Sequence, residues 1–386
     1  MPIKRLLSDK LSVYASQFRA VALMGARQCG KTTLTKMLFA EKPYVNFENI
    51  DVLQLSQTDP RGFLDKYKST GAIFDEIQKA SVLFNYLQEI LDNEKEKGKY
   101  ILTGSSNFLL NQNISQSLAG RVGYIEMYPL SFFEIPKSKS ISVWQQIVNG
   151  GYPELWASKI IPQLYYPSYI QSFIEKDIRQ FIHANNLIHY QRFIKLIASR
   201  ISCEWNNSTI AMELGIDAKT VNAWLSFLQL AGIVYLLPPY HSNFGKRVIK
   251  RPKFYFADTG IVCSLLGINN EEQLETHPLK GAIFENYVLM ELVKLQSFNI
   301  EPAQFYFWRS IDGVEIDVII EKNGKFTPIE IKSGKTYQPN WWRNIDKFNE
   351  YTQNKNKNFI IYLGNEEMEM KGKKYLLNFK SIDSVL

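Results

Sequence analysis

Apolar and polar positions along the first 140 residues follow two periods in turn. Runs rich in apolar residues at 21–24, 72–74 and 99–103 predict short buried strands, whereas residues 33–40 carry apolar side chains at helical spacing. Strands that alternate with helices are typical of a parallel α/β sheet with helices on its faces. The pattern therefore predicts an α/β domain over residues 1–140.

The pattern changes after about residue 140. Residues 165–181 and 190–201 have apolar side chains three and four positions apart, which predicts helices. Two strand-like runs follow, at 232–237 and 253–256. We place a mainly helical middle region at 141–260.

The last region, 261–386, has mixed periodicity again. Residues 281–292 have the spacing of an amphipathic helix, and residues 314–320 and 328–333 have the composition of strands. The sequence therefore predicts a second α/β domain at the C-terminal end of the chain.

The first strand runs into a glycine-rich loop that fits the pattern G-x-x-x-x-G-K-[ST]. The loop consists of Gly25, Ala26, Arg27, Gln28, Cys29, Gly30, Lys31, Thr32 and Thr33. Glycines let backbone N–H groups approach phosphate oxygens, and the N-terminus of the following helix adds positive potential. In such a P-loop, Lys31 reaches the β and γ phosphates and Thr32 holds Mg²⁺. We therefore predict that ATP and ADP are ligands and that Mg²⁺ is a cofactor.

Two acids follow the second strand. Asp75 ends the strand near the expected Mg²⁺, and Glu76 is placed to polarise an attacking water, which predicts hydrolysis of ATP. The other interpretation, two acids that begin a helix over 77–88, is less favoured because a P-loop precedes them. The third strand ends at Ser106 and Asn107, where many such ATPases keep a residue that senses the γ phosphate.

Arg121 is a candidate for stabilising the transition state. An arginine finger neutralises charge on the transferred phosphoryl group, and it comes from the same subunit or from a neighbouring one. A neighbouring finger would require a homo-oligomer. A solvated surface arginine fits the sequence equally well, so all three interpretations stay open.

Residues 209–225 fit a helix-turn-helix. Gly215 lies in the turn, Asp217 caps the second helix, and Val221 and Leu225 face inward. With the two following strands, this order predicts a winged helix.

Basic and polar side chains make this winged helix a candidate DNA-binding element. The exposed helix positions and the segment between the strands supply Lys219, Thr220, Asn222, Lys246, Arg247, Lys250 and Arg251. Such residues contact phosphates and base edges in DNA complexes. A structural lid or a protein contact is the alternative role of such a winged helix in an ATPase.

The C-terminal region carries a second set of chemical groups. Glu285 lies near the start of the predicted helix, Asp317 lies on one strand, and Glu330 and Lys332 lie on the next. Residues two apart in a strand face the same side, so Glu330 and Lys332 point to one site. The carboxylates, including Asp317 and Glu330, are candidate ligands for one or two Mg²⁺ ions, and Lys332 is placed to orient or activate water.

This order resembles the PD-(D/E)xK nuclease core, and the glutamate at position 285 is similar to that of Holliday-junction resolvases. The segment Glu315-Ile316-Asp317 stands where that core usually has a proline–aspartate pair. The resemblance implies a restriction-endonuclease-like fold and Mg²⁺-dependent cleavage of DNA, with Glu285, Asp317, Glu330 and Lys332 as catalytic residues. Because some domains of this fold only bind, a silent site remains the alternative.

Seven segments along the chain also carry a family resemblance. They are residues 25–33, 74–78, 102–106, 118–122, 129–134, 150–154 and 256–260. Together they resemble the prokaryotic AAA-type ATPases (AAA_14) that carry a C-terminal DUF4143 region. The resemblance implies an AAA+-like P-loop ATPase joined to a nuclease-like domain that acts on DNA.

Composition adds a few bounds. The 386 residues have a formal net charge of +7, which favours polyanionic partners. No apolar stretch reaches the roughly 20 residues that span a bilayer, and the N-terminus lacks a signal-peptide core, so we expect a cytoplasmic protein without a membrane partner. The cysteines Cys29, Cys203 and Cys263 are too scattered for a disulfide framework or a zinc site.

The sequence thus predicts three domains: a P-loop ATPase at 1–140, a helical region with a winged helix at 141–260, and a PD-(D/E)xK-like domain at 261–386. Two functions fit this order. The first is an ATPase coupled to DNA binding and to Mg²⁺-dependent DNA cleavage. The second is a nucleotide-dependent switch whose silent nuclease-like domain binds DNA or a protein.

Overall fold

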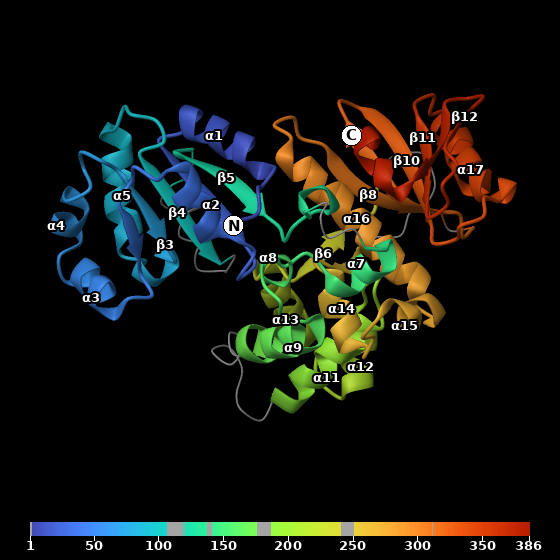
Figure 1. Cartoon of the computed structure of the whole chain (residues 1–386), viewed down its shortest axis with the longest axis horizontal. Helices are drawn as coiled ribbons and strands as arrows, with labels where there is room; N and C mark the ends of the chain where they lie inside the picture. The colour runs from blue at the N-terminus through green and yellow to red at the C-terminus, as the bar shows by residue number, and fades with distance from the viewer. Residues whose placement is uncertain are drawn as a thin grey trace. The chain divides into compact units, whose positions relative to one another are not determined.

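The computed structural model describes residues 2–105, 118, 120–136, 141–175, 187–240, 251–310 and 312–386 (Figure 1). The chain forms two compact units, each with its own sheet. The first unit comprises Met1–Ser138, Tyr152–Lys159 and Ser226–Ile233, and the second comprises Lys139–Gly151, Ile160–Leu225 and Val234–Leu386. The chain therefore crosses between the units several times.

A five-stranded parallel sheet organises the first unit. Its strand order is β2–β3–β4–β1–β5, and every neighbouring pair is parallel. The strands are β1 (Ala20–Gly25), β2 (Tyr44–Asn46), β3 (Ala72–Asp75), β4 (Tyr100–Ser105) and β5 (Val122–Met127). The parallel α/β sheet predicted from the sequence is confirmed. Because parallel strands end at one edge, the segments that follow β1 and β3 meet there.

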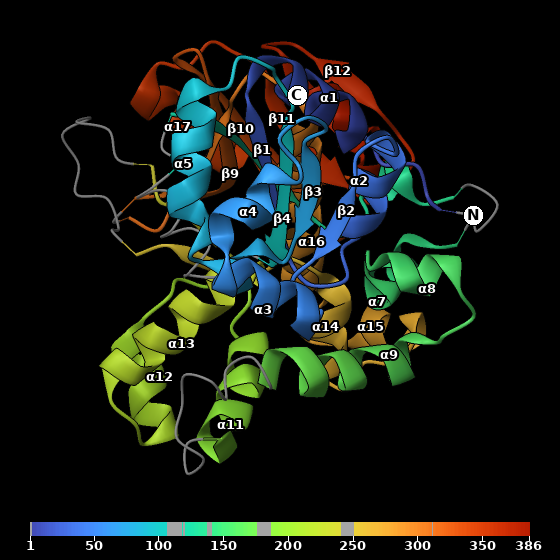
Figure 2. The ribbon, with the colours of Figure 1, turned by 90° about the vertical axis from the view of Figure 1, so that its left-hand side faces the viewer.

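The helices of the first unit are α1 (Leu7–Gln17), α2 (Lys31–Leu38), α3 (Ile50–Thr58), α4 (Pro60–Asp65), α5 (Leu83–Asn93) and α8 (Pro153–Ala157), with the 3₁₀ turns η1 (Ile77–Ala80) and η2 (Phe132–Glu134). Several of them pack against the sheet through apolar side chains. Figure 2 views the sheet from the side of α3, α4 and α5. On that side Phe63 of α4 and Leu87 of α5 share a core with Phe74 and Tyr100, whose rings stack.

The helical spacing over residues 77–88 corresponds to two elements, η1 and α5. Glu76 has a left-handed backbone conformation, with a φ of 54°, and turns the chain sharply after β3. Ile77 and Ala80 are then fully buried in η1 before α5 begins at Leu83. The residue after Asp75 is thus held in a conformation that non-glycine residues rarely adopt, a feature that recurs at functional sites.

The second unit begins with a helical region. Its helices are α7 (Val143–Asn149), α9 (Pro162–Tyr169), the π-helical turn η4 (Ile170–Glu175), α11 (Leu187–Ala198), α12 (Asn207–Leu214), α13 (Ala218–Leu230), α14 (Thr259–Leu265) and α15 (Glu271–Thr276). An antiparallel pair follows α13, formed by β6 (Val234–Leu237) and β7 (Lys253–Phe256). The C-terminal end of α13 belongs to the first unit.

The helix-turn-helix predicted over 209–225 is present as α12 and α13. Gly215 ends α12 with a φ of 67°, the left-handed conformation that favours glycine at this position. Asp217 Oδ1 accepts a hydrogen bond from the Thr220 N–H at 2.8 Å, and Val221 and Leu225 are buried. The predicted basic residues Lys246, Arg247 and Lys250 lie outside the described residues.

A buried carboxylate holds this helical region together. Asp258 accepts hydrogen bonds from the Tyr166 hydroxyl at 2.8 Å, the Gly151 N–H at 2.6 Å and the Gly260 N–H at 3.0 Å. A Cβ atom would lie 1.9 Å from the Tyr166 oxygen at Gly150 and 2.1 Å from it at Gly260. Both positions therefore require glycine.

A six-stranded mixed sheet forms the C-terminal part of the second unit, in the order β12–β13–β11–β10–β9–β8. The strands are β8 (Gln304–Arg309), β9 (Glu315–Lys322), β10 (Lys325–Lys332), β11 (Asn358–Tyr362), β12 (Met368–Met370) and β13 (Lys374–Asn378). The helices are α16 (Lys280–Phe298) and α17 (Arg343–Thr352), with the 3₁₀ segments η6 (Pro339–Trp342) and η7 (Phe379–Val385). The mixed strands and helices that the sequence predicted for the C-terminal region are therefore present.

The amphipathic character expected for the helix at 281–292 is wrong. Buried residues occur all around α16 between Ile283 and Gln296, including Asn286, Glu291 and Lys294. The helix packs against α14, α15, β10 and η7. Polar residues on this helix are therefore partnered inside the protein and do not mark a solvent face.

Replacing Asp258 with alanine leaves the Gly151 and Gly260 N–H groups without their acceptor and leaves the Tyr166 hydroxyl with the Asn149 carbonyl oxygen as its acceptor. We expect this change to lower the free energy of unfolding by about 3 kcal/mol, whereas Tyr166→Phe should lower it by about 1 kcal/mol. Thermal and urea unfolding followed by circular dichroism measure both effects. Asp383→Ala, at an exposed position, is the control, and equal midpoints for Asp258→Ala and Asp383→Ala would contradict the role of Asp258.

Candidate functional site

The P-loop connects β1 to α2 at the carboxyl edge of the parallel sheet. Gly25 ends β1 so close to β5 that a Cβ atom would lie 2.1 Å from the Met127 carbonyl oxygen. Gly30 has a φ of 101° immediately before α2 begins at Lys31. Both glycines of the sequence pattern thus have a steric reason, and the loop leads directly into a helix N-terminus.

The Lys31 side chain folds back over the loop. Its Nζ donates hydrogen bonds to the carbonyl oxygens of Gly25 at 2.8 Å and Ala26 at 2.9 Å, and the residue is only 6% exposed. A buried ammonium needs such acceptors, and phosphate oxygens would satisfy it in the same way.

Asp75, at the end of β3, is the acceptor for three hydroxyl groups. Thr32 Oγ1 lies 2.8 Å and the Tyr44 hydroxyl 2.7 Å from Asp75 Oδ2, and Thr103 Oγ1 bonds to Oδ1. Burial and the Asp75 carboxylate raise the pKa of Tyr44 well above its usual range, so its hydroxyl stays a donor. The sequence predicted Thr32 and Asp75 together, but Tyr44 and Thr103 were missed.

Glu76 is held by a neighbour on η1. Gln78 Nε2 donates to Glu76 Oε2 at 2.5 Å, and Gln78 is buried. Since Glu76 directly follows Asp75, its carboxylate starts from the same edge of the sheet as the P-loop. Lys31, Thr32, Asp75 and Glu76, which the sequence analysis grouped together, thus lie at the same edge of the parallel sheet.

The other residues of the predicted loop have mixed environments. Ala26 and Cys29 are buried, Gln28 has a φ of 62°, Arg27 Nη1 lies 4.0 Å from Glu48 Oε1, and Thr33 is exposed. Buried Cys29 fits a small filler role.

Arg121 lies in the turn before β5. Its Nε and Nη2 bind the carboxylate of Asp92 on α5, at 2.5 and 3.0 Å. A finger role would therefore require exchange of this ion pair. The predicted sensor residues Ser106 and Asn107 lie outside the described residues.

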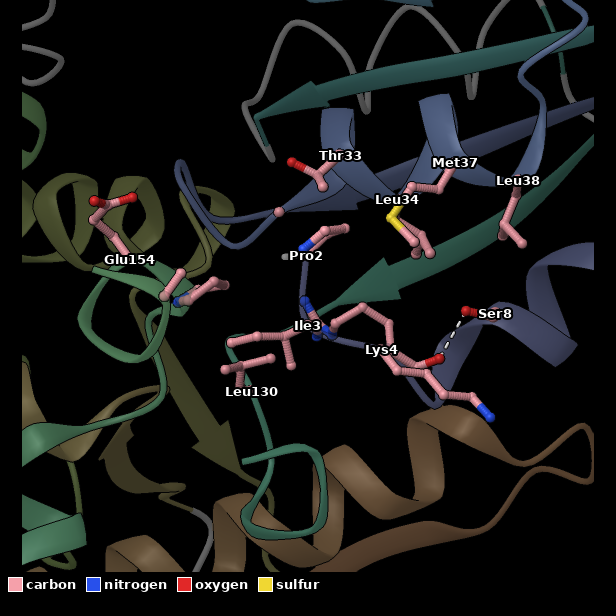
Figure 3. A pocket seen from close by; sticks show the side chains of 14 residues that line it. Pro2, Ile3, Lys4, Ser8, Thr33, Leu34, Met37, Leu38, Leu130 and Glu154 are labelled. Atoms are coloured by element: carbon pink, nitrogen blue, oxygen red, sulfur yellow. Dashed lines mark hydrogen bonds between the residues drawn. The ribbon is translucent and has the colours of Figure 1, made fainter. Parts of the chain in front are cut away.

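A cavity of about 460 Å³ opens beside the P-loop (Figure 3). Its lining is mostly apolar and includes Ile3, Leu34, Met37, Leu130, Pro153 and Ala157. Thr33 and Glu154 add polar groups at the wall. The volume and the apolar lining are those of a small-molecule pocket.

Arg5 fixes the N-terminal segment that forms one wall of this cavity. Its guanidinium donates to the carbonyl oxygens of Cys29 and Tyr128, both at 2.7 Å, and to Glu134 Oε1 at 2.9 Å. Glu134 also receives the Leu6 N–H at 2.7 Å. Arg5 thus ties the segment to the P-loop, and no local pattern in the sequence indicated this.

The second unit brings Asp317, Glu330 and Lys332 together on antiparallel neighbours. In the β9–β10 register Val318 faces Ile329, so Asp317 and Glu330 lie at the next pair of positions. Lys332 Nζ forms an ion pair with Glu330 and lies 4.0 Å from Asp317 Oδ2. Asp317 Oδ2 also accepts the Ile331 N–H at 2.8 Å.

Burial gives Glu330 an unusual carboxyl group. Glu330 is 2% exposed, and its Oε1 has no hydrogen-bond partner of ordinary geometry, although the Asn344 side chain favours the charged form. Burial, together with the charge of Asp317, raises the pKa of Glu330 to about 8. An unpartnered buried oxygen beside a second carboxylate fits a divalent cation, which would supply the missing partner.

Glu285 is engaged differently. Its Oε1 accepts the Tyr255 hydroxyl at 2.7 Å and the Lys253 ammonium at 3.2 Å, and burial raises its pKa to about 7. Within the described ranges no three His, Cys, Asp or Glu side chains are placed to hold one metal ion. A metal centre with Glu285, Asp317 and Glu330 as joint ligands is therefore not present in that part of the chain.

Lys253 and Tyr255 were missed by the sequence analysis. The signal that could have found them is the alternation of β7, where Phe254 and Phe256 form one face and Lys253 and Tyr255 the other.

Stability of the second unit should depend on the Glu330 carboxyl. Its pKa is raised above the unfolded value, so the folded state binds the proton more tightly between about pH 4.5 and 8. Stability contributed by this group is therefore present at low pH and is lost as the pH rises through 8. We expect the thermal midpoint to fall by a few degrees from pH 6 to 8.5, and Glu330→Gln to flatten this dependence. An identical pH profile for Glu350→Gln, an exposed control, and Glu330→Gln would contradict it.

Among the described residues, no helix has the combined length and apolar character that crossing a bilayer requires.

Comparison with protein families divides the chain into three matches. Residues 17–136 match the model of an AAA domain, residues 141–272 a domain of unknown function (DUF8612), and residues 280–382 a second domain of unknown function (DUF4143). An AAA domain implies ATP binding, in agreement with the P-loop geometry.

Relatives match over most of the chain. An uncharacterized protein of Mycobacterium tuberculosis is 30% identical over 321 residues, which cover 82% of this chain and 70% of that protein. An uncharacterized protein of Methanocaldococcus jannaschii is 24% identical, covering 77% and 71%. Among solved structures, the Walker-type ATPase PABY2304 of Pyrococcus abyssi has 16% identity and a TM-score of 0.46, covering 67% of this chain and 94% of that one. The chain belongs to the family of ATPases that join an AAA domain to a C-terminal DUF4143 region.

Proposed function

We propose that this protein hydrolyses ATP at the P-loop and that nucleotide binding regulates a metal-dependent DNA nuclease site in the second unit. The observation that carries the first part is the pairing of buried Lys31 with loop carbonyls beside the Thr32–Asp75 hydrogen bond. The observation that supports the second part is the unpartnered Glu330 oxygen next to Asp317 and Lys332.

The P-loop residues fit a nucleotide with Mg²⁺. Lys31 Nζ would exchange its carbonyl acceptors for oxygens of the β and γ phosphates, and Thr32 and Asp75 would hold the ion. Mg²⁺ supplies neutralisation of the phosphate charge when bound. Glu76 would take a proton from the attacking water. The water oxygen would then bond to the γ phosphorus as the bond between the γ phosphorus and the β–γ bridging oxygen breaks.

The apolar cavity beside the P-loop supports a nucleotide over a simple polyphosphate. Thr33, at the start of α2, and Leu34 line it next to Gly30. A purine base would bury its faces against such side chains, which adds hydrophobic binding energy to the phosphate contacts.

The carboxylate pair of the second unit supports phosphodiester chemistry. Asp317 and Glu330 would hold one divalent ion, which supplies Lewis-acid activation of the phosphodiester when bound. Lys332 would orient the attacking water or pair with a phosphate oxygen. The Ile331 N–H fixes the Asp317 carboxylate, so the site is positioned before a ligand arrives.

DNA is the proposed substrate because the positive net charge and the helix-turn-helix both favour a polyanionic ligand. The net charge is +7, and Lys219 and Asn222 are exposed on α13, the second helix of the helix-turn-helix. The Thr220 hydroxyl donates a hydrogen bond to Asp217, so Thr220 is a weaker candidate for contacting DNA than the sequence indicated. Arg251 is the exposed end of the predicted basic segment.

The alternative, a nucleotide-dependent switch with a silent second site, is favoured by one observation. Glu285 is bound to Lys253 and Tyr255, so one of the four expected catalytic groups is already engaged. Such a protein would bind DNA or a protein partner without cutting it.

Lys31→Ala should remove nucleotide binding because no other ammonium replaces its contacts with the phosphates. We expect the dissociation constant for ATP·Mg²⁺ to rise about 100-fold or more, measured by isothermal titration calorimetry. Lys66→Ala, at an exposed position of the same unit, is the control and should bind as the wild type does. Unchanged affinity in Lys31→Ala would refute the nucleotide site.

Asp317→Asn and Lys332→Met should abolish cleavage of DNA, with rates at least about 100-fold lower. The assay uses linear, nicked and four-way-junction DNA with Mg²⁺ or Mn²⁺, with and without ATP. Lys335→Met, an exposed lysine three residues away, is the control. Absence of cleavage by the wild-type protein, with DNA binding retained, would support the switch instead.

A further inference from the structure

Strand β7 sends two polar side chains toward the carboxylate site of the second unit. Phe254 packs on Trp205 and Phe256 on Phe254, so these aromatic rings form the core face of the strand. Lys253 and Tyr255 lie on the opposite face, and both contact Glu285 of α16. The strand precedes residues 280–382, the part that matches DUF4143. The residues around Glu285 thus come from two matched regions, DUF8612 for Lys253 and Tyr255 and DUF4143 for Glu285.

The Lys253 ammonium is buried among acids. It lies 3.2 Å from Glu285 Oε1, forms a second ion pair with Glu315, and the residue is 3% exposed. Burial alone would lower its pKa, but Tyr255 and the surrounding carboxylates, including Asp317, raise it well above the ordinary value. Lys253 is therefore a permanent positive charge at this site.

A second contact fixes the strand on the helix. Asn286, the residue after Glu285, accepts the Phe256 N–H and donates to the Phe256 carbonyl, both at 2.8 Å. Asn286 is fully buried. The position of Lys253 relative to Glu285 is thus also set by the bonds between the Asn286 side chain and the β7 backbone, and does not depend on the ion pair alone.

We propose that Lys253 is a positioning residue that restricts the C-terminal site to a single divalent cation at Asp317 and Glu330. This inference rests on the proposed metal site and specifies its stoichiometry. The ammonium binds Oε1 of Glu285, and its positive charge repels a second cation placed beside it. Glu285 then orients Lys253 and is not a metal ligand.

Bases already pair with the acids around Lys253. Lys253 pairs with Glu285 and Glu315, Arg309 pairs with Glu204 and Glu315, and Lys332 pairs with Glu330. A second divalent cation would have to displace one of these bases.

The test is Mn²⁺ binding followed by electron paramagnetic resonance, without nucleotide. All proteins carry Asp75→Asn and Glu76→Gln, so that neither carboxylate beside the P-loop can bind the ion. The parent protein should bind one ion with the spectrum of an isolated Mn²⁺, and Asp317→Asn should lose it. Lys253→Met should bind a second ion and give a spin-coupled pair, whereas Lys253→Arg should keep the single uncoupled ion.

The outcomes separate the two proposals. A spin-coupled pair in the parent protein would overturn the role of Lys253 without any variant at that position, so the test stands even if Lys253→Met fails to fold. One ion of unchanged affinity in a folded Lys253→Met would overturn it too, and would leave the metal site intact. No bound ion in any of the proteins would overturn the metal site itself, and the role of Lys253 with it.

Discussion

The buried ammonium of Lys31 is the group on which the nucleotide site depends. It belongs to the first residue of α2 and is buried beside the carboxyl end of β1, where a charge without a partner would be strongly destabilising. Two loop carbonyls partner it, and their positions follow from Gly25 and its close approach to Met127. The position of the Lys31 ammonium therefore depends on the glycines and on the strand order. A bound phosphate would replace the two carbonyl oxygens that already accept its hydrogen bonds.

The same constraint explains the second unit. Glu330 and Lys253 are as buried as Lys31, and each is paired with an opposite charge. Lys332 lies between Glu330 and Asp317, so the acids are balanced only in part, and Glu330 keeps a raised pKa. The proposal that this site binds a cation rests on this partial balance, which is a property of burial and not of any single residue.

Local patterns predicted what depends on local spacing. The P-loop, the Asp75–Glu76 pair, the turn at Gly215 and the alternation of Glu330 and Lys332 all follow from residues a few positions apart. Tyr44, Thr103 and Arg5 could not be predicted, because their contacts join segments 24 to 129 residues apart in the chain. The amphipathic prediction for α16 failed because its burial depends on packing against other elements: Asn286 bonds to β7, and Glu291 and Lys294 pair with each other while buried.

One covalent connection between the two units is short and lies beside the P-loop cavity. Gly151 belongs to the second unit, where its N–H binds Asp258, and Pro153, two residues later, lines the cavity beside the P-loop in the first unit. Asp258 also holds Tyr166 and precedes α14, which packs against α16, the helix that carries Glu285. Under the proposed regulation, a nucleotide that displaces α8 would act on Gly151, whose N–H is bound to the buried Asp258 carboxylate. The proposed coupling of ATP to the second unit would then begin at this covalent connection, because Gly151 is anchored in that unit.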